Sequence, residues 1–163
     1  MSFANNLFGK EYSLHHPSGN PFSFSSLREN PLTLLIFIKS TCHTCIFLLP
    51  YLSEYLHRQS GGTGSMLLVS QDTRDETLKF ARAIDPTMPL VVDHPVYSLS
   101  RVLEFKTVPA LFLLDSQGSI LEMSEGFVRA EIEEMMKRLE QENQLPQLPL
   151  FPANEDIPRL KPG

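Results

Sequence analysis

Apolar runs alternate with stretches of helical periodicity along most of the chain. Residues 32–38, LTLLIFI, are apolar almost throughout and rich in β-branched and aromatic side chains, which predicts a strand buried on both faces. A second short buried strand is predicted over 66–69, and a short extended piece over 89–93. Two more strands, 109–114 and 119–123, flank the turn sequence DSQG and predict a hairpin.

The helical periodicity falls between and after these strands. Helices are predicted over 42–57 and 96–105, and Thr73 with Glu76 has the T-x-x-E form of a capping box that begins another helix. A last helix is predicted over 129–142. Its apolar stripe is expected to face the core and its glutamates to face solvent. The stripe is Ile132, Met135, Met136 and Leu139, and the glutamates are Glu131, Glu133, Glu134 and Glu140. The glycine-rich stretch 60–65 is expected to break the first helix.

The two ends of the chain differ from this central pattern. Residues 11–24 predict two short extended pieces around a turn at 17–20, hence an N-terminal β-hairpin. We therefore expect one domain over 1–142 followed by a proline-rich tail over 143–163. The tail is expected either to be extended or disordered, or to wrap over the domain through Leu148, Leu150 and Phe151.

Strands that alternate with helices and end in a hairpin and a helix predict an α/β fold with a central mixed β-sheet flanked by helices. The length of 163 residues suits one such domain. A net charge of -5 gives no basic surface for nucleic acid. No apolar run is long enough to cross a bilayer, so no membrane segment is expected. The first twenty residues show no secretory signal, which predicts a cytoplasmic protein, or an exported one if a leader has been removed.

Both cysteines of the chain stand where the first long strand gives way to a helix. Cys42 and Cys45 would lie about 5–6 Å apart on one helix face, within reach of a disulfide. At the helix start, unpaired N–H groups and the helix dipole favour a thiolate at Cys42. Cys45 would lie one turn further in and be shielded. This predicts that Cys42 attacks a substrate disulfide and that Cys45 resolves the mixed disulfide.

Two other interpretations of the pair stay open. The cysteines could be small buried apolar residues, or they could be half of a metal site. Zinc usually requires a second ligand pair of similar spacing, and none is present, although His43, His57 and His94 could each contribute one ligand.

With these features the chain resembles the thioredoxin superfamily. The strand LLIFI leads into the CxxC, and Pro50 follows Cys45 by five residues, where thioredoxins kink the active-site helix. Far downstream, VPALFLLDSQG is similar to the family's cis-proline strand and hairpin. The resemblance implies that Pro109 is cis and that Val108 before it binds the substrate through its backbone.

The N-terminal hairpin and a central insertion resemble the TlpA-like and redoxin branch, which is related to AhpC/TSA. This resemblance spans roughly residues 9–142. It implies a thiol–disulfide oxidoreductase of the protein-disulfide reductase type that needs no cofactor and no metal. The implied partners are protein disulfide substrates and a redox protein that donates or accepts electrons, with the chain acting as a monomer.

Some residues depart from the family pattern. Thr41 stands where thioredoxins carry a tryptophan beside the substrate, and Ile36 stands where many bury an acid that moves protons during resolution. The proton acceptor of Cys45 is therefore not identified by sequence. His43 and Thr44 separate the cysteines and are candidate modulators. A protonated His43 would stabilise the thiolate, whereas a solvated His43 would have little effect.

The resemblance also leaves two alternative functions. One is a thiol peroxidase of the redoxin type, although Lys39 occupies the position where peroxidases carry Thr or Ser. The other is a copper or zinc carrier that uses the two thiolates, although copper-delivery relatives space their cysteines CxxxC.

Overall fold

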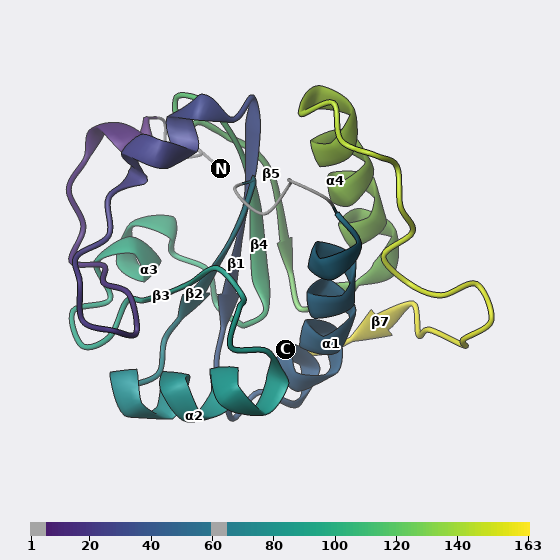
Figure 1. The fold of residues 1–163 in the computed structure, drawn as a ribbon, viewed down its shortest axis with the longest axis horizontal. Coiled ribbons are helices and arrows are strands. Elements are labelled where there is room, and N and C mark those ends of the chain that lie inside the picture. Colours follow the sequence, from purple (N-terminus) through teal and green to yellow (C-terminus); the bar gives the residue numbers. More distant parts are fainter. Residues whose placement is uncertain (1–5, 60–64) are drawn as a thin grey trace.

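A five-stranded mixed sheet forms the centre of the protein (Figure 1). The computed structural model describes residues 6–59 and 65–163. The strands, in spatial order, are β3 (Leu90–Val92), β2 (Met66–Ser70), β1 (Leu32–Ile38), β4 (Ala110–Asp115) and β5 (Ile120–Glu125). The first three are parallel to one another, whereas β4 runs antiparallel to β1 and β5 antiparallel to β4. This confirms the predicted mixed sheet.

Helices cover both faces of the sheet (Figure 1). On one side lie α1 (His43–Arg58) and α4 (Arg129–Glu142), and α3 (Ser98–Leu103) lies on the other with the N-terminal segment. The capped helix α2 (Arg74–Ile84) packs against the same core as α1. Over the described residues, none of the helices combines the length and the apolar character that a membrane crossing requires.

Alternation along β1 explains why this strand is apolar almost throughout. Leu34, Ile36 and Ile38 belong to the core beneath α1 and α4, while Leu35 and Phe37 belong to the core beneath α3 and the N-terminal segment. All seven residues of the strand are buried. A central strand with helices on both faces favours apolar side chains at nearly every position, as the sequence predicted, and Thr33 is the one polar residue of this strand.

The N-terminal hairpin is smaller than predicted. His15 forms isolated bridges with Pro21 and with Val92 of β3, so this segment extends the edge of the main sheet. Two short 3-10 helices that were not predicted, η1 (Leu7–Gly9) and η2 (Phe24–Glu29), lie on either side of it. They are too short to show a helical period in the sequence.

Most other boundaries agree with the predictions. The capping box is present, with the N–H of Glu76 donating to the Thr73 hydroxyl and the N–H of Thr73 donating to the Glu76 carboxylate. The glycine-rich break falls largely on residues 60–64, which lie outside the described residues.

The proline-rich tail packs on the domain, which is the second of the two alternatives. Leu150, Phe151 and Ile157 are buried in the core formed by α1 and α4. Further on, β7 (Leu160–Lys161) pairs antiparallel with β6 (Phe127–Val128), which precedes α4. Figure 1 shows the tail running past α4 and returning toward the start of α1.

This packing corrects one prediction about α4. Glu140 was expected on the solvated side, but it is 4% exposed. It accepts hydrogen bonds from the Tyr55 hydroxyl at 3.0 Å and from the backbone N–H of Leu148 at 2.7 Å. The tail covers this side of the helix, so the carboxylate bridges α1 and the tail. The same burial raises the pKa of the Tyr55 hydroxyl.

A tail that contributes to the core must contribute to stability. Phe151 packs edge-to-face against the rings of Tyr51 and Phe127 and is 5% exposed. We expect Phe151→Ala to lower the free energy of unfolding by about 3 kcal/mol, measured by urea denaturation. The exposed Asn154→Ala is the matched control and should change it by less than about 0.5 kcal/mol. Equal stability of the two variants would contradict the packing of the tail.

Candidate functional site

The two cysteines occupy the first turn of α1. Cys42 is the N-cap residue, and its Sγ accepts a hydrogen bond from the backbone N–H of Cys45 at 3.1 Å. Cys42 is half-buried, whereas Cys45 is fully buried, and both are free thiols. The predicted helix start is therefore correct, and one sulfur faces the surface while the other lies behind it.

Burial sets the chemistry of the inner cysteine. Burial raises the pKa of the Cys45 thiol, and its hydrogen bond with Cys42 raises it further. Cys45 is therefore held as a thiol in the reduced protein. A group that is buried and protonated suits a second, resolving step better than a first attack, because the thiolate is the nucleophile.

The cis-proline loop lies directly against the outer cysteine. The bond between Val108 and Pro109 is cis, as the resemblance implied. The Cys42 thiol donates to the carbonyl oxygen of Val108 at 3.3 Å. Pairing of β1 with β4 produces this contact, because Phe37 and Ala110 are partners at the end of the ladder from which both segments emerge.

The residues around the cysteines differ in their contacts. The side chains of Thr41 and His43 are exposed and form no hydrogen bond with the described residues. Thr44 is 5% exposed, and its hydroxyl donates to the carbonyl oxygen of Pro162 in the tail. The structure therefore brings Thr44 together with the tail and leaves His43 in solvent.

A buried acid near the cysteines was missed by the sequence analysis. Asp72 follows β2 and is 5% exposed, and its carboxylate accepts the backbone N–H of Ser40 at 2.6 Å. Its negative charge contributes to the raised pKa of Cys45, after the larger effect of burial. The expected position, Ile36, is apolar and buried. Because β1 and β2 are parallel neighbours, the acid reaches the site from the adjacent strand.

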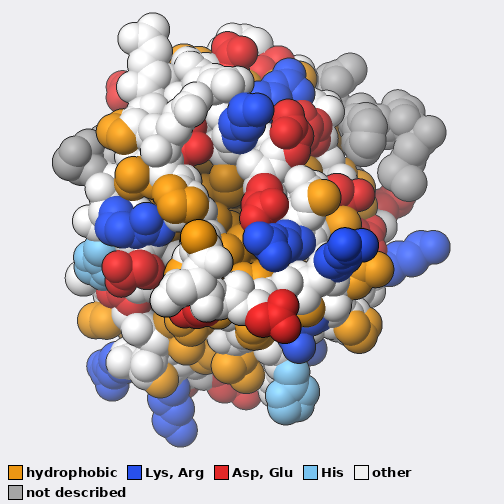
Figure 2. Space-filling model, turned by 90° about the vertical axis from the view of Figure 1, so that its right-hand side faces the viewer, with side chains coloured by type: hydrophobic (Ala, Val, Ile, Leu, Met, Phe, Trp, Pro, Cys, Tyr) orange, Lys and Arg blue, Asp and Glu red, His pale blue; other side chains and the backbone are white. Residues whose placement is uncertain are grey.

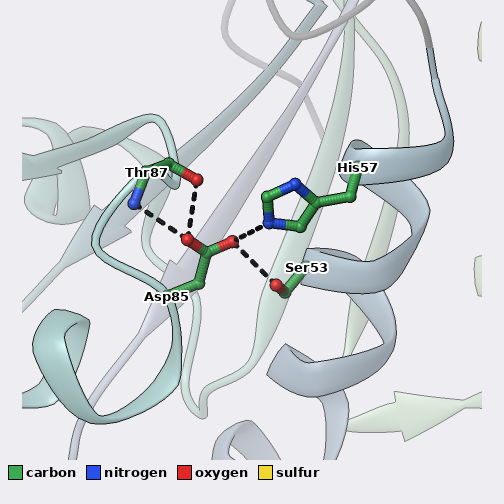
Figure 3. A network of polar contacts seen from close by, with 4 residues as sticks. All are labelled: Ser53, His57, Asp85 and Thr87. Atoms are coloured by element: carbon green, nitrogen blue, oxygen red, sulfur yellow. Dashed lines mark hydrogen bonds and ion pairs between the residues drawn. The ribbon is translucent and has the colours of Figure 1, made fainter.

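A second polar network joins α1 to the loop after α2 (Figure 3). One oxygen of Asp85 accepts from Ser53 at 2.7 Å and pairs with His57 at 2.9 Å. The other accepts the N–H and hydroxyl of Thr87 at 2.9 and 2.6 Å. A serine hydrolase needs the serine bonded to the histidine. Here both contact the same carboxylate oxygen, so the network is a structural link.

The remaining candidate features lie apart from the cysteines. A cavity of about 700 Å³ between α2 and the N-terminal turn is lined by neither cysteine. Within residues 6–59 and 65–163, no three His, Cys, Asp or Glu side chains gather as metal ligands would. His57 stands fifteen positions after Cys42, roughly 22 Å along the helix, which is too far for a shared metal.

A strand that leads into a CxxC at a helix start, facing a cis-proline beside the neighbouring antiparallel strand, defines a thioredoxin-like protein. The sequence profile of the AhpC/TSA family matches residues 9–123. The chain therefore belongs to the AhpC/TSA family, within the redoxin branch of the thioredoxin superfamily. No curated protein sequence matches it.

Similar solved structures support the fold. The proposed thiol:disulfide interchange protein DsbE from Chlorobium tepidum aligns with a TM-score of 0.68 at 20% identity, over 85% of this chain and 99% of that one. A secreted Mycobacterium tuberculosis disulfide oxidoreductase homologous to E. coli DsbE gives 0.61 at 16% identity, over 80% and 95%. StoA from Bacillus subtilis gives 0.55 at 26% identity, over 75% and 90%.

The network of Figure 3 predicts a dependence of stability on pH. Burial raises the pKa of Asp85, but the hydrogen bonds from Thr87, Ser53 and His57 outweigh it and lower the pKa to about 2. A lowered folded-state pKa stabilises the protein above the ordinary value of 3.8, and this contribution is lost as the pH falls toward 2.

We therefore expect Asp85→Asn to lower the free energy of unfolding at neutral pH by about 2 kcal/mol. Its stability should also fall less steeply than that of the wild type between about pH 4 and pH 2. The measurement is urea denaturation across this range. Asp156→Asn, which changes an exposed acid in the tail, should retain the wild-type slope. Parallel curves for wild type and Asp85→Asn would contradict the assignment.

Proposed function

We propose that the protein exchanges disulfides with protein substrates through a dithiol–disulfide cycle of Cys42 and Cys45. The contact geometry of Cys42 is the main support. Its sulfur is partly accessible, accepts a backbone N–H at the helix start, and lies 3.3 Å from the Val108 carbonyl oxygen. Membership of the AhpC/TSA family and the likeness to disulfide oxidoreductases support a thiol–disulfide oxidoreductase in general.

In the first step the Cys42 thiolate attacks one sulfur of a substrate disulfide. A new S–S bond joins Cys42 to the substrate, the old S–S bond breaks, and the leaving sulfur departs with the electron pair and takes up a proton. The Cys45 N–H, 3.1 Å from Cys42 Sγ, stabilises the attacking thiolate. The Val108 backbone, beside the same sulfur, is positioned to align an extended substrate segment.

In the second step Cys45 loses its proton and attacks Cys42 Sγ. The Cys42–Cys45 disulfide forms and the second substrate sulfur leaves as a thiol, so the substrate gains two electrons and two protons. We assign Asp72 as the proton acceptor. It is a buried carboxylate whose charge acts on Cys45, and it is tied to the loop before Cys42 through Ser40.

We infer that the partners are protein disulfides and a separate redox protein that reoxidises or reduces the pair, and that the chain acts as a monomer. Figure 2 shows the face with α4 and the tail, where positive and negative side chains lie interspersed among hydrophobic ones. Such a mixed surface steers no strongly charged partner to this face. We assign recognition to the backbone groups beside Cys42, whose sulfur lies 3.3 Å from the Val108 carbonyl oxygen. A cytoplasmic location, or an exported one, stays a prediction.

Replacing each cysteine in turn should block a different step of the reaction. We expect Cys45→Ser to accumulate a mixed disulfide with insulin, because attack proceeds and resolution does not. Cys42→Ser should form none, and both should reduce insulin only at the background rate. Non-reducing electrophoresis and the insulin turbidity assay measure these results. Trapping by Cys42→Ser would reverse the assignment, and peroxide consumption that exceeds insulin reduction would favour the peroxidase alternative.

Asp72 gives a second test of the mechanism. Asp72→Asn keeps an oxygen that can accept the Ser40 N–H but cannot take up a proton. We expect it to slow resolution of the mixed disulfide about tenfold, while Cys42 alkylation changes less than about twofold. Stopped-flow measurement of the two steps separates them. Since the lost charge also eases ionisation of Cys45, faster resolution would show that Asp72 acts only electrostatically.

A further inference from the structure

The end of the tail lies on the residues that surround the outer cysteine. Residues Leu160–Lys161 form β7 against β6, and the Lys161 ammonium lies 5.0 Å from the centre of the Phe47 ring. The carbonyl oxygen of Pro162 then accepts the Thr44 hydroxyl, one residue before Cys45. The tail is thus attached to the first turn of α1.

Two glycines lie where the tail and the site are in close contact. A Cβ on Gly163 would collide with the hydroxyl of Thr107 and the carbonyl oxygen of Val108. A Cβ on Gly126 would lie 3.2 Å from the carbonyl oxygen of Lys161, and Gly126 also has a φ of +72°. Gly126 in turn donates its N–H to the Pro109 carbonyl oxygen at 2.8 Å. The tail therefore lies along the surface from Gly126 to Val108.

Val108 contacts both the tail and the outer cysteine. Its carbonyl oxygen is the group to which the Cys42 thiol donates, and Gly163 lies so close to the same oxygen that a Cβ there would collide with it. The space beside Val108 cannot hold a bound substrate segment and residues 160–163 at the same time. One must leave before the other binds.

The contacts of this segment are weak compared with those that precede it. Leu160 is 67% exposed, and none of residues 160–163 is buried. Upstream, Ile157 is 5% exposed in the core, and Arg129 donates to its carbonyl oxygen at 3.2 Å. Residues 160–163 can therefore detach while the tail up to Ile157 stays anchored.

We propose that residues 160–163 are a gate that occupies the substrate position beside Cys42 and competes with protein substrates for it. That the segment competes with protein substrates rests on the proposed function. Whether the segment covers Cys42 can be tested independently of that function. A small reagent reaches the half-buried sulfur whether or not the tail is bound, whereas a large one requires the tail to leave.

The test uses two variants of the whole 163-residue chain that release the segment. Gly163→Val places a side chain against Val108 and Thr107, and Leu160→Gly with Lys161→Gly removes strand propensity and the contact with Phe47. The control carries Asn154→Gly and Asp156→Gly, two exposed positions elsewhere in the tail. Thermal melting should give the same midpoint for all of them, because no buried side chain changes.

The first readout is alkylation of Cys42 by a maleimide with a long polyethylene glycol chain, relative to iodoacetamide. We expect this ratio to rise about tenfold in both release variants and to stay at the wild-type value in the control, because the accessible state is no longer a minor one. An unchanged ratio in the release variants would overturn the proposal.

The second readout is kcat/KM for insulin reduction, which should rise in parallel with the alkylation ratio. A peptide with the sequence of residues 155–163 should inhibit the release variants, and a scrambled peptide should not. A higher alkylation ratio without insulin reduction by any variant would support the gate and contradict the proposed function. A higher ratio with insulin kcat/KM unchanged would show that the tail does not compete with protein substrates and would overturn the proposal.

Discussion

The pairing of β1 with β4 is the constraint on which the site depends. Both strands are buried, and their antiparallel register ends with Phe37 opposite Ala110. At that end the chain continues from β1 to Cys42, and Val108 lies just before β4. The Cys42 sulfur and the Val108 carbonyl oxygen therefore lie 3.3 Å apart. A shift of register by one residue would turn every side chain of the strand to the opposite core, which the packing on both faces opposes.

The tail is the second part of the structure that determines the surroundings of Cys42. The buried carboxylate of Glu140 connects α1, α4 and the backbone of Leu148, and Phe151 completes an aromatic cluster beneath the tail. These contacts bring the chain back to the start of α1, where Thr44 binds it. A segment that contributes to the core at one end can thereby regulate access to the reactive sulfur at the other.

Much of the fold could be predicted because it depends on local pattern. Apolar runs identified the strands, the T-x-x-E sequence identified a cap, and the change from an apolar run to a helical pattern identified the helix start at the cysteines. The failures at α4 and at the site depend on contacts between distant segments. The period of α4 placed Glu140 in solvent because nothing in one helix indicates what later covers it. Asp72 is thirty residues from Cys42 in sequence and reaches the site only because β1 and β2 are parallel neighbours.

The central claim is that Cys42 is the accessible thiol because it caps a helix, whereas Cys45 lies behind it and is held as a thiol by burial. It is tested most directly by treating the reduced, folded protein with a limiting amount of iodoacetamide and mapping the modified peptide by mass spectrometry. The account predicts alkylation at Cys42 with Cys45 left as a thiol until the protein is unfolded. Equal labelling of both, or labelling of Cys45 first, would contradict it.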